Sequence, residues 1–212
     1  MIALDAHTGK LSWSYSGRNA AYASPILSQS SEAKQILDFD EVSLGAWDYQ
    51  TGKRVWEHIP KHPSDFNVPT PMVLQNQIIV SSENNGTRLL QTGLSNREKP
   101  KLIAAFNDEA SDTHTPIRIG PYVAAVYGNV YLLDPENELK VVAMMEVESL
   151  GENPSLIAFE DRLLVVTEKR MMLLLQLQQS KLVELGRYQI REGQQRRRKG
   201  RPEIRIEQEN SL

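Results

Sequence analysis

A nine-residue motif that occurs twice is the feature that most limits what this chain can fold into. The motif is Asp-x-x-Thr-Gly-Lys-x-x-Trp, and its two copies are Asp5–Trp13 and Asp48–Trp56. The two copies are 43 residues apart, counted from Gly9 to Gly52. A repeat of this length is typical of proteins that stack similar small units, because one such unit cannot bury a core alone.

A second marker repeats with a similar period. A small polar residue followed by proline precedes an apolar segment at Ser24-Pro25, Thr70-Pro71, Thr115-Pro116 and Asn153-Pro154. Successive prolines are 46, 45 and 38 residues apart along the chain. Two independent markers with similar spacing predict consecutive units at 24–58, 70–106, 115–147 and 153–190, after half a unit at 2–15.

Each unit has the pattern of four short strands separated by turn residues such as Asn84-Asn85-Gly86 and Gly128-Asn129. No segment has a capped apolar period of 3.6 residues, so we expect almost no helix. The sequence therefore predicts an all-β protein, a β-propeller of four-stranded antiparallel blades, with about four and a half blades in residues 1–190.

The motif residues have structural roles in this interpretation. The carboxylates of Asp5 and Asp48 can accept backbone N–H groups in the following turn. Gly9 and Gly52 supply the positive φ of a tight hairpin. The large rings of Trp13 and Trp56, on the next strand, can fill the space between neighbouring blades.

Both motif copies resemble the tryptophan-docking repeat of the PQQ-like (quinoprotein alcohol dehydrogenase-like) β-propellers. The resemblance covers residues 2 to about 190 and implies a ring of usually about eight blades, of which this chain would be a C-terminal half. Because the repeat is already in progress at Ile2 and no signal-peptide pattern is visible there, we expect upstream sequence. The resemblance also implies an extracytoplasmic (periplasmic) location.

Polar and acidic residues are concentrated in the connections 59–69, 107–114 and 148–153, which a propeller gathers on one face. This expected rim of a ligand face consists of Asp65, Asn67, Asp108, Asp112 and His114, together with Glu109 and Glu152. Hard oxygen ligands would suit a cation such as calcium. The residues lack the spacing of a calcium-binding loop, so solvated loop residues are the alternative interpretation.

Two functions compete. The resemblance suggests a non-catalytic scaffold that presents loops to a protein or ligand. The propeller lipoprotein of the outer-membrane-protein assembly machinery, which is similar to this family, is a scaffold of that kind. The alternative is part of a PQQ- and calcium-dependent quinoprotein dehydrogenase of alcohols or sugars. Many of those enzymes stack PQQ on an adjacent-cysteine disulfide, but this chain has no cysteine and no stretch that aligns with their calcium ligands. We therefore expect PQQ and calcium only if another half of the ring supplies their site.

Composition limits the remaining partners. The net charge is −3, and residues 191–212 carry seven Lys or Arg against four Glu, which leaves −6 on the rest of the chain. We expect a basic disordered tail, whose run Arg196–Arg201 is the one hint of nucleic acid or anionic lipid. No apolar run is long enough to span a membrane. The expected partner is another protein or a second propeller half.

Overall fold

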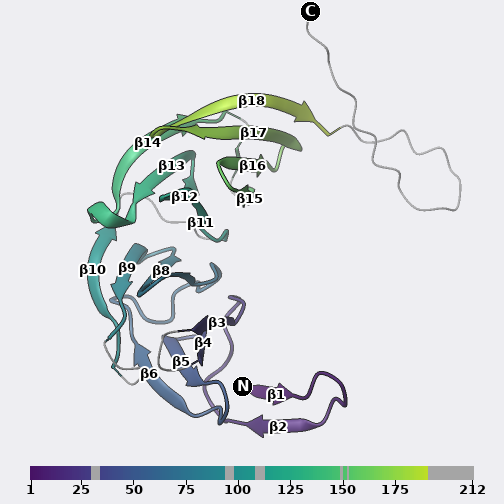
Figure 1. Cartoon of the computed structure of the whole chain (residues 1–212), viewed down its shortest axis with the longest axis vertical. Coiled ribbons are helices and arrows are strands. Elements are labelled where there is room, and N and C mark those ends of the chain that lie inside the picture. The colour runs from purple at the N-terminus through teal and green to yellow at the C-terminus, as the bar shows by residue number, and fades with distance from the viewer. Residues whose placement is uncertain (30–33, 94–97, 108–112, 149, 152, 191–212) are drawn as a thin grey trace, which may run out of the picture. The chain divides into compact units, whose positions relative to one another are not determined.

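β-Strands are the main secondary structure of the described residues, as Figure 1 shows. The structure, a computed structural model, describes residues 1–29, 34–93, 98–107, 113–148, 150–151 and 153–190. One short 3₁₀-helix, η1 (Pro135–Asn137), is the only helix in the part that is described. The predicted tail at 191–212 lies outside the described residues.

In the described residues, eighteen strands form one two-stranded and four four-stranded sheets. The strands of the first two sheets are β1 (Ile2–Leu4), β2 (Leu11–Ser14), β3 (Ile26–Gln29), β4 (Lys34–Phe39), β5 (Leu44–Asp48) and β6 (Arg54–His58). The third sheet holds β7 (Met72–Leu74), β8 (Gln77–Ser82), β9 (Gly86–Gln91) and β10 (Lys101–Phe106). The last two sheets hold β11 (Ile117–Ile119), β12 (Tyr122–Tyr127), β13 (Asn129–Asp134), β14 (Lys140–Glu146), β15 (Ser155–Phe159), β16 (Arg162–Val166), β17 (Met171–Gln178) and β18 (Lys181–Gln189).

Strands that follow one another in the sequence are neighbours in every sheet, for example β11-β12-β13-β14. Neighbouring strands pair antiparallel, for example β11 with β12 and β15 with β16, with register set by short hairpins. This order is that of a propeller blade, so the predicted all-β fold of four-stranded antiparallel blades is confirmed. The sequence pattern predicts a strand over residues 42–48, but β5 begins at Leu44, because residues 40–43 form a turn closed by Asp40.

The two motif copies form the same turn. In the second copy, Asp48 Oδ1 accepts the backbone N–H and the hydroxyl of Thr51, both at 2.7 Å. In the first copy, Asp5 makes the same contacts with Thr8 at 2.8 and 2.7 Å. In the second copy the next residue, Gly52, has a φ of 69°. This value lies in the left-handed region, which a residue without Cβ adopts at low cost.

The two tryptophans of the motif each lie between neighbouring sheets. Trp13, on β2, donates from Nε1 to the carbonyl of Tyr49 at 3.1 Å, and its ring lies against Gly52 in the second motif copy. Trp56, on β6, is buried in a core that also contains Leu37, Ile78 and Leu90. The repeat therefore links one sheet to the next through its tryptophan.

The proline marker also links successive sheets. The backbone N–H of Ser24 donates to Thr70 Oγ1 at 3.2 Å, and the backbone N–H of Thr70 donates to Thr115 Oγ1 at 2.9 Å. The hydroxyls of Thr70 and Thr115, each just before a proline, thus accept a backbone N–H of the preceding repeat. This contact gives a physical reason for a small polar residue at that position.

The described residues divide into two compact units. The first contains Met1–Pro116 and Pro135–Lys140, and the second contains Ile117–Asp134 and the described residues from Val141 onward. The core of the first unit lies between the β3–β6 and β7–β10 sheets. The core of the second lies between the β11–β14 and β15–β18 sheets, where Val126, Leu132, Leu163 and Leu175 meet.

Candidate functional site

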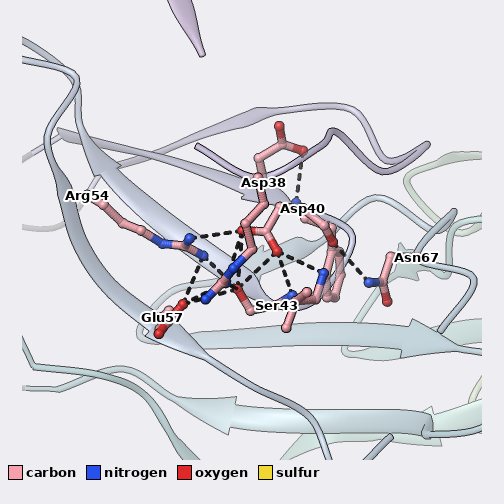
Figure 2. Close-up of polar contacts among 9 residues, drawn as sticks. Asp38, Asp40, Ser43, Arg54, Glu57 and Asn67 are labelled. Carbon is pink, nitrogen blue, oxygen red and sulfur yellow. Dashed lines mark hydrogen bonds and ion pairs between the residues drawn. The ribbon is translucent and has the colours of Figure 1, made fainter. Parts of the chain in front are cut away.

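A buried carboxylate closes the turn between β4 and β5 in the first unit (Figure 2). Asp40 is 5% exposed, and its Oδ1 accepts the backbone N–H groups of Val42 at 2.9 Å and Ser43 at 2.7 Å. Its Oδ2 lies 2.9 Å from Arg54 Nη1 and 3.4 Å from Arg18 Nη1. Burial works to raise the pKa of Asp40, but these N–H groups and Arg54 outweigh it and hold the pKa below its usual value.

Ser43 and Glu57 complete this ion-pair cluster. Arg54 Nη2 donates to Ser43 Oγ at 2.6 Å, and Arg18 Nη1 donates to the same oxygen at 3.0 Å. Arg18 also pairs with Glu57 Oε2 at 2.9 Å, while the Arg54 guanidinium lies 4.9 Å from the Trp47 ring centre. Ser43 is fully buried, and its own hydroxyl donates to the Asp40 carboxylate, with Oγ 3.2 Å from Oδ1. The cluster therefore fastens the connection that carries Arg18 onto the β4–β5 turn.

A second polar cluster fastens the connection between β6 and β7. Asp65 Oδ2 accepts the backbone N–H of Asn84 at 2.8 Å and the side-chain amide of Asn85 at 3.0 Å. Its Oδ1 accepts the Asn84 amide at 2.8 Å and the backbone N–H of Phe66 at 2.9 Å. Partial burial works to raise the pKa of Asp65, but the hydrogen bonds, led by those from Asn84, keep it below its usual value. Both carboxylate oxygens are thus engaged within the protein.

Asn67 joins the two clusters. Its side chain is 1% exposed and donates to the backbone carbonyl of Asp40 at 3.1 Å. Its own carbonyl accepts the backbone N–H of Ala23 at 3.1 Å. Asn67 therefore holds Ala23, before β3, through its backbone carbonyl and Asp40, after β4, through its side-chain amide.

An exposed aromatic pair lies on these fastened connections. Tyr22, between β2 and β3, and Phe66, between β6 and β7, stack with ring centres 5.6 Å apart and planes 16° apart. Tyr22 is 76% exposed and Phe66 is 55% exposed. Each is next to a fixed residue, since Ala23 is bonded to Asn67 and Phe66 is bonded to Asp65. The pair is thus presented to solvent on a rigid base.

The structure gives different positions and contacts to the residues expected at a ligand-face rim. Asp65 and Asn67 lie in one connection and make the internal contacts described above. His114, in the connection before β11, is buried. Asp108 and Asp112 lie outside the described residues. Within the described part of the chain, no three His, Cys, Asp or Glu side chains are grouped as a metal site would require.

Sequence reasoning missed the aromatic pair and the Asp40 cluster. Each ring of the pair lies in a connection just before a polar-proline marker, with Tyr22 two residues ahead of Ser24 and Phe66 four ahead of Thr70, but their stacking depends on tertiary packing. The cluster has no such signal, since Arg18, Asp40 and Arg54 belong to three separate segments.

No described helix is long and apolar enough to cross a membrane.

Asp38, beside this cluster, has a raised pKa. Its carboxylate points away from Arg54 and Glu57 in Figure 2, and it accepts the backbone N–H of Phe39 at 2.9 Å. Burial raises the pKa of Asp38 to about 6, against an ordinary value of 3.8; the Phe39 N–H opposes this rise and the Asp40 charge adds to it. The folded protein therefore binds more protons than the unfolded chain between these two values.

This proton uptake predicts a pH dependence. The stability contributed by protonated Asp38 is present below about pH 4 and is lost as the pH rises to about 6. We expect the Asp38→Asn variant to gain about 1–2 kcal/mol relative to the wild type across this window. Urea titrations of both proteins from pH 4 to pH 8 measure the gain, and a difference that does not change with pH would contradict the assignment.

The four-stranded sheets and the contacts that link one repeat to the next define an all-β repeat protein of the propeller class. A family model described as outer membrane protein assembly factor BamB matches residues 1–141. This chain therefore belongs to that family, and its PQQ-like repeat is confirmed. A search of curated protein sequences finds no match.

Solved structures agree with the fold. BamB from Moraxella catarrhalis matches with a TM-score of 0.65 and 16% identity, over 88% of this chain and 54% of that one. The computationally designed Ika8 protein matches with a TM-score of 0.59 and 11% identity, over 81% and 50%. The Cps50 (Swd1) β-propeller domain from Myceliophteria thermophila matches with a TM-score of 0.54 and 14% identity, over 87% and 60%. This chain spans between 50% and 60% of the length of these three matched chains.

Proposed function

We propose that this chain is part of a non-catalytic propeller scaffold that binds another protein through the connections carrying Tyr22 and Phe66. The observation that carries the proposal is the exposed, stacked aromatic pair on a base fixed by Asp40, Asp65 and Asn67. Tyrosine and other aromatic residues are enriched where proteins bind one another, and a fixed base reduces the entropy lost on binding.

The family supports a partner of a particular kind. Its description is that of an outer membrane protein assembly factor, so the proposed partner is a protein component of outer membrane protein assembly, and the proposed location is the periplasm. The polar clusters favour a scaffold over a catalyst, since the oxygens of Asp40 and Asp65 bond to groups of the chain itself.

Site-specific photo-cross-linking tests the proposal. Tyr22 or Phe66 would be replaced in cells by the photoreactive analogue p-benzoyl-L-phenylalanine, with Tyr49, an exposed tyrosine on the β5–β6 turn, as the matched control. We expect one discrete protein adduct at positions 22 and 66 and none at 49. Equal labelling at all three positions would contradict a binding face. Dye reduction by the purified chain that depends on added PQQ and calcium would contradict the non-catalytic role.

A further inference from the structure

A cleft of about 780 Å³ lies in the second unit, between the β11–β14 and β15–β18 sheets. Its walls come from the β12–β13 turn, from the end of β14 and the two residues that follow it, from the β16–β17 turn with the start of β17, and from β18. All of these segments belong to one compact unit, whereas the Asp40 cluster and the aromatic pair lie in the other. The cleft is therefore defined by a single packed pair of sheets.

The floor of the cleft is apolar. Leu173 belongs to the core of the unit and is 2% exposed, and Met145, Val147 and Met171 are half-buried side chains that pack against the same core. Methionine side chains are flexible and polarizable, so they adapt to apolar groups of different shape. An apolar side chain that enters the cleft would therefore leave water for an adaptable apolar surface, which is favourable.

The rim of the cleft carries an excess of negative charge. Arg187 donates to the Glu184 carboxylate from Nε at 2.7 Å and from Nη2 at 2.8 Å, so these two charges neutralise each other. The pKa of Arg187 is raised chiefly by this bond with Glu184, and Glu148 adds a smaller share. Among the described residues, the exposed carboxylates of Glu146 and Glu148 make no hydrogen bond or ion pair, and one further cation, Lys169, lines the cleft. A cationic group of a partner therefore fits beside these two carboxylates.

The first unit shows what occupies the corresponding place there. The connection from β6 to β7 passes the turn between the second and third strands of the next sheet, where Asn85 binds the backbone of His62. Asn85 Oδ1 accepts the His62 N–H and Asn85 Nδ2 donates to the His62 carbonyl, both at 2.9 Å. In the second unit the corresponding turn carries Lys169 at the cleft, and the connection from β14 to β15 is shorter, 147–154 against 59–71. A polypeptide backbone thus fills this place in one repeat, and the cleft lies at the same place in the other.

We infer that the cleft binds a segment of another protein in which a lysine or arginine side chain lies beside apolar side chains. The cation would lie between Glu146 and Glu148, and the apolar side chains would lie on Met145 and Met171. The two carboxylates repel polyanions such as nucleic acid, and the apolar floor favours a peptide over a bare inorganic cation. The cleft would be a second binding site of the scaffold, independent of the aromatic pair.

Titration of the full chain with a short peptide tests this inference. The probe is Leu-Lys-Leu-Lys-Leu with capped ends, added to protein labelled with ¹³C at the methionine methyl groups. We expect the NMR signals of Met145 and Met171 to shift, while Met72, on β7 in the other unit, stays unchanged. The same peptide with glutamate in place of lysine should cause no shifts. A shift at Met72 as large as those at Met145 and Met171 would contradict a site in the cleft.

Charge reversal supplies the matched pair of variants. Glu148→Lys is expected to raise the Kd of the peptide by about tenfold or more, because a carboxylate is replaced by a like charge. Glu160→Lys changes an exposed glutamate of the β15–β16 turn, outside the cleft, and should leave the Kd within about twofold of the wild type. Tyr22→Ala/Phe66→Ala should also bind the peptide as the wild type does, which separates this site from the aromatic pair. Equal losses for the two glutamate variants, or a wild-type chain that does not bind the peptide, would overturn the inference.

Discussion

Replacing Asp40 by alanine is expected to lower the free energy of unfolding by about 3–5 kcal/mol, the cost of leaving buried cationic groups without their partner. Asp40 is almost fully buried and accepts two backbone N–H groups as well as pairing with Arg54 and Arg18. Without it, the β4–β5 turn loses its closing contacts and Arg54 remains partly buried beside Trp47. Urea titration at pH 7 measures the change.

Asp161→Ala is the matched control for Asp40→Ala. Asp161 also pairs with an arginine, Arg162, at 3.2 Å, but both side chains are largely exposed to water. Exposed pairs of this kind contribute little, so we expect a loss of less than about 1 kcal/mol. Equal losses for the two variants would show that the Asp40 cluster does not hold the turn.

Replacing Gly52 by alanine is expected to cost about 2–5 kcal/mol of unfolding free energy, because backbone strain and overpacking act together. Gly52 has a φ of 69°, and a Cβ there would overlap the ring of Trp13. Gly9 is the matched control, since it occupies the same position in the first motif copy with a φ of 67° and would place its Cβ in open space. Gly9→Ala should therefore cost only about 1–2 kcal/mol, from strain alone.

The difference between the two glycines isolates the contact with the tryptophan. In the background of Trp13→Ala, the unfolding free energy lost through Gly52→Ala should fall to the loss caused by Gly9→Ala. Trp13→Ala and Gly52→Ala remove or disturb the same contact, so their effects are not additive. Thermal or urea unfolding of the wild type, the two single variants and the Trp13→Ala/Gly52→Ala double variant gives this comparison. An extra cost that survives removal of Trp13 would mean that its ring is not what excludes a side chain at position 52.

The repeat made the fold readable from the sequence, because its signals are local. The glycine, aspartate and proline positions of each unit fix hairpins within a few residues. The pattern predicts strands at 54–58, 72–74, 77–82, 117–119, 122–127 and 155–159, and these are the bounds of β6, β7, β8, β11, β12 and β15. β5 differs because Val42, an apolar residue that reads as strand, donates its N–H to Asp40 instead of to a neighbouring strand. A side chain that captures a backbone group in this way competes with the strand ladder.

The candidate site was less accessible to sequence reasoning because its contacts join distant segments. Acidic residues in connections suggested ligands, yet Asp65 bonds to Asn84, 19 residues away, and Asn67 bonds to Asp40, 27 residues away. Whether a loop carboxylate faces solvent or fastens a neighbouring turn depends on tertiary packing. The stacking of Tyr22 on Phe66 depends on the same packing, so composition alone could not indicate that these two rings form one surface.

The affinity of the cross-linked partner for three forms of this chain tests the proposed function most directly. The forms are the wild type, the Tyr22→Ala/Phe66→Ala double variant and Tyr49→Ala, which removes an exposed ring from another turn of the same unit. If the pair anchors the partner, the double variant should raise Kd by at least roughly 30-fold, while Tyr49→Ala leaves it within about threefold of the wild type. A double variant that binds as tightly as the wild type would contradict the account.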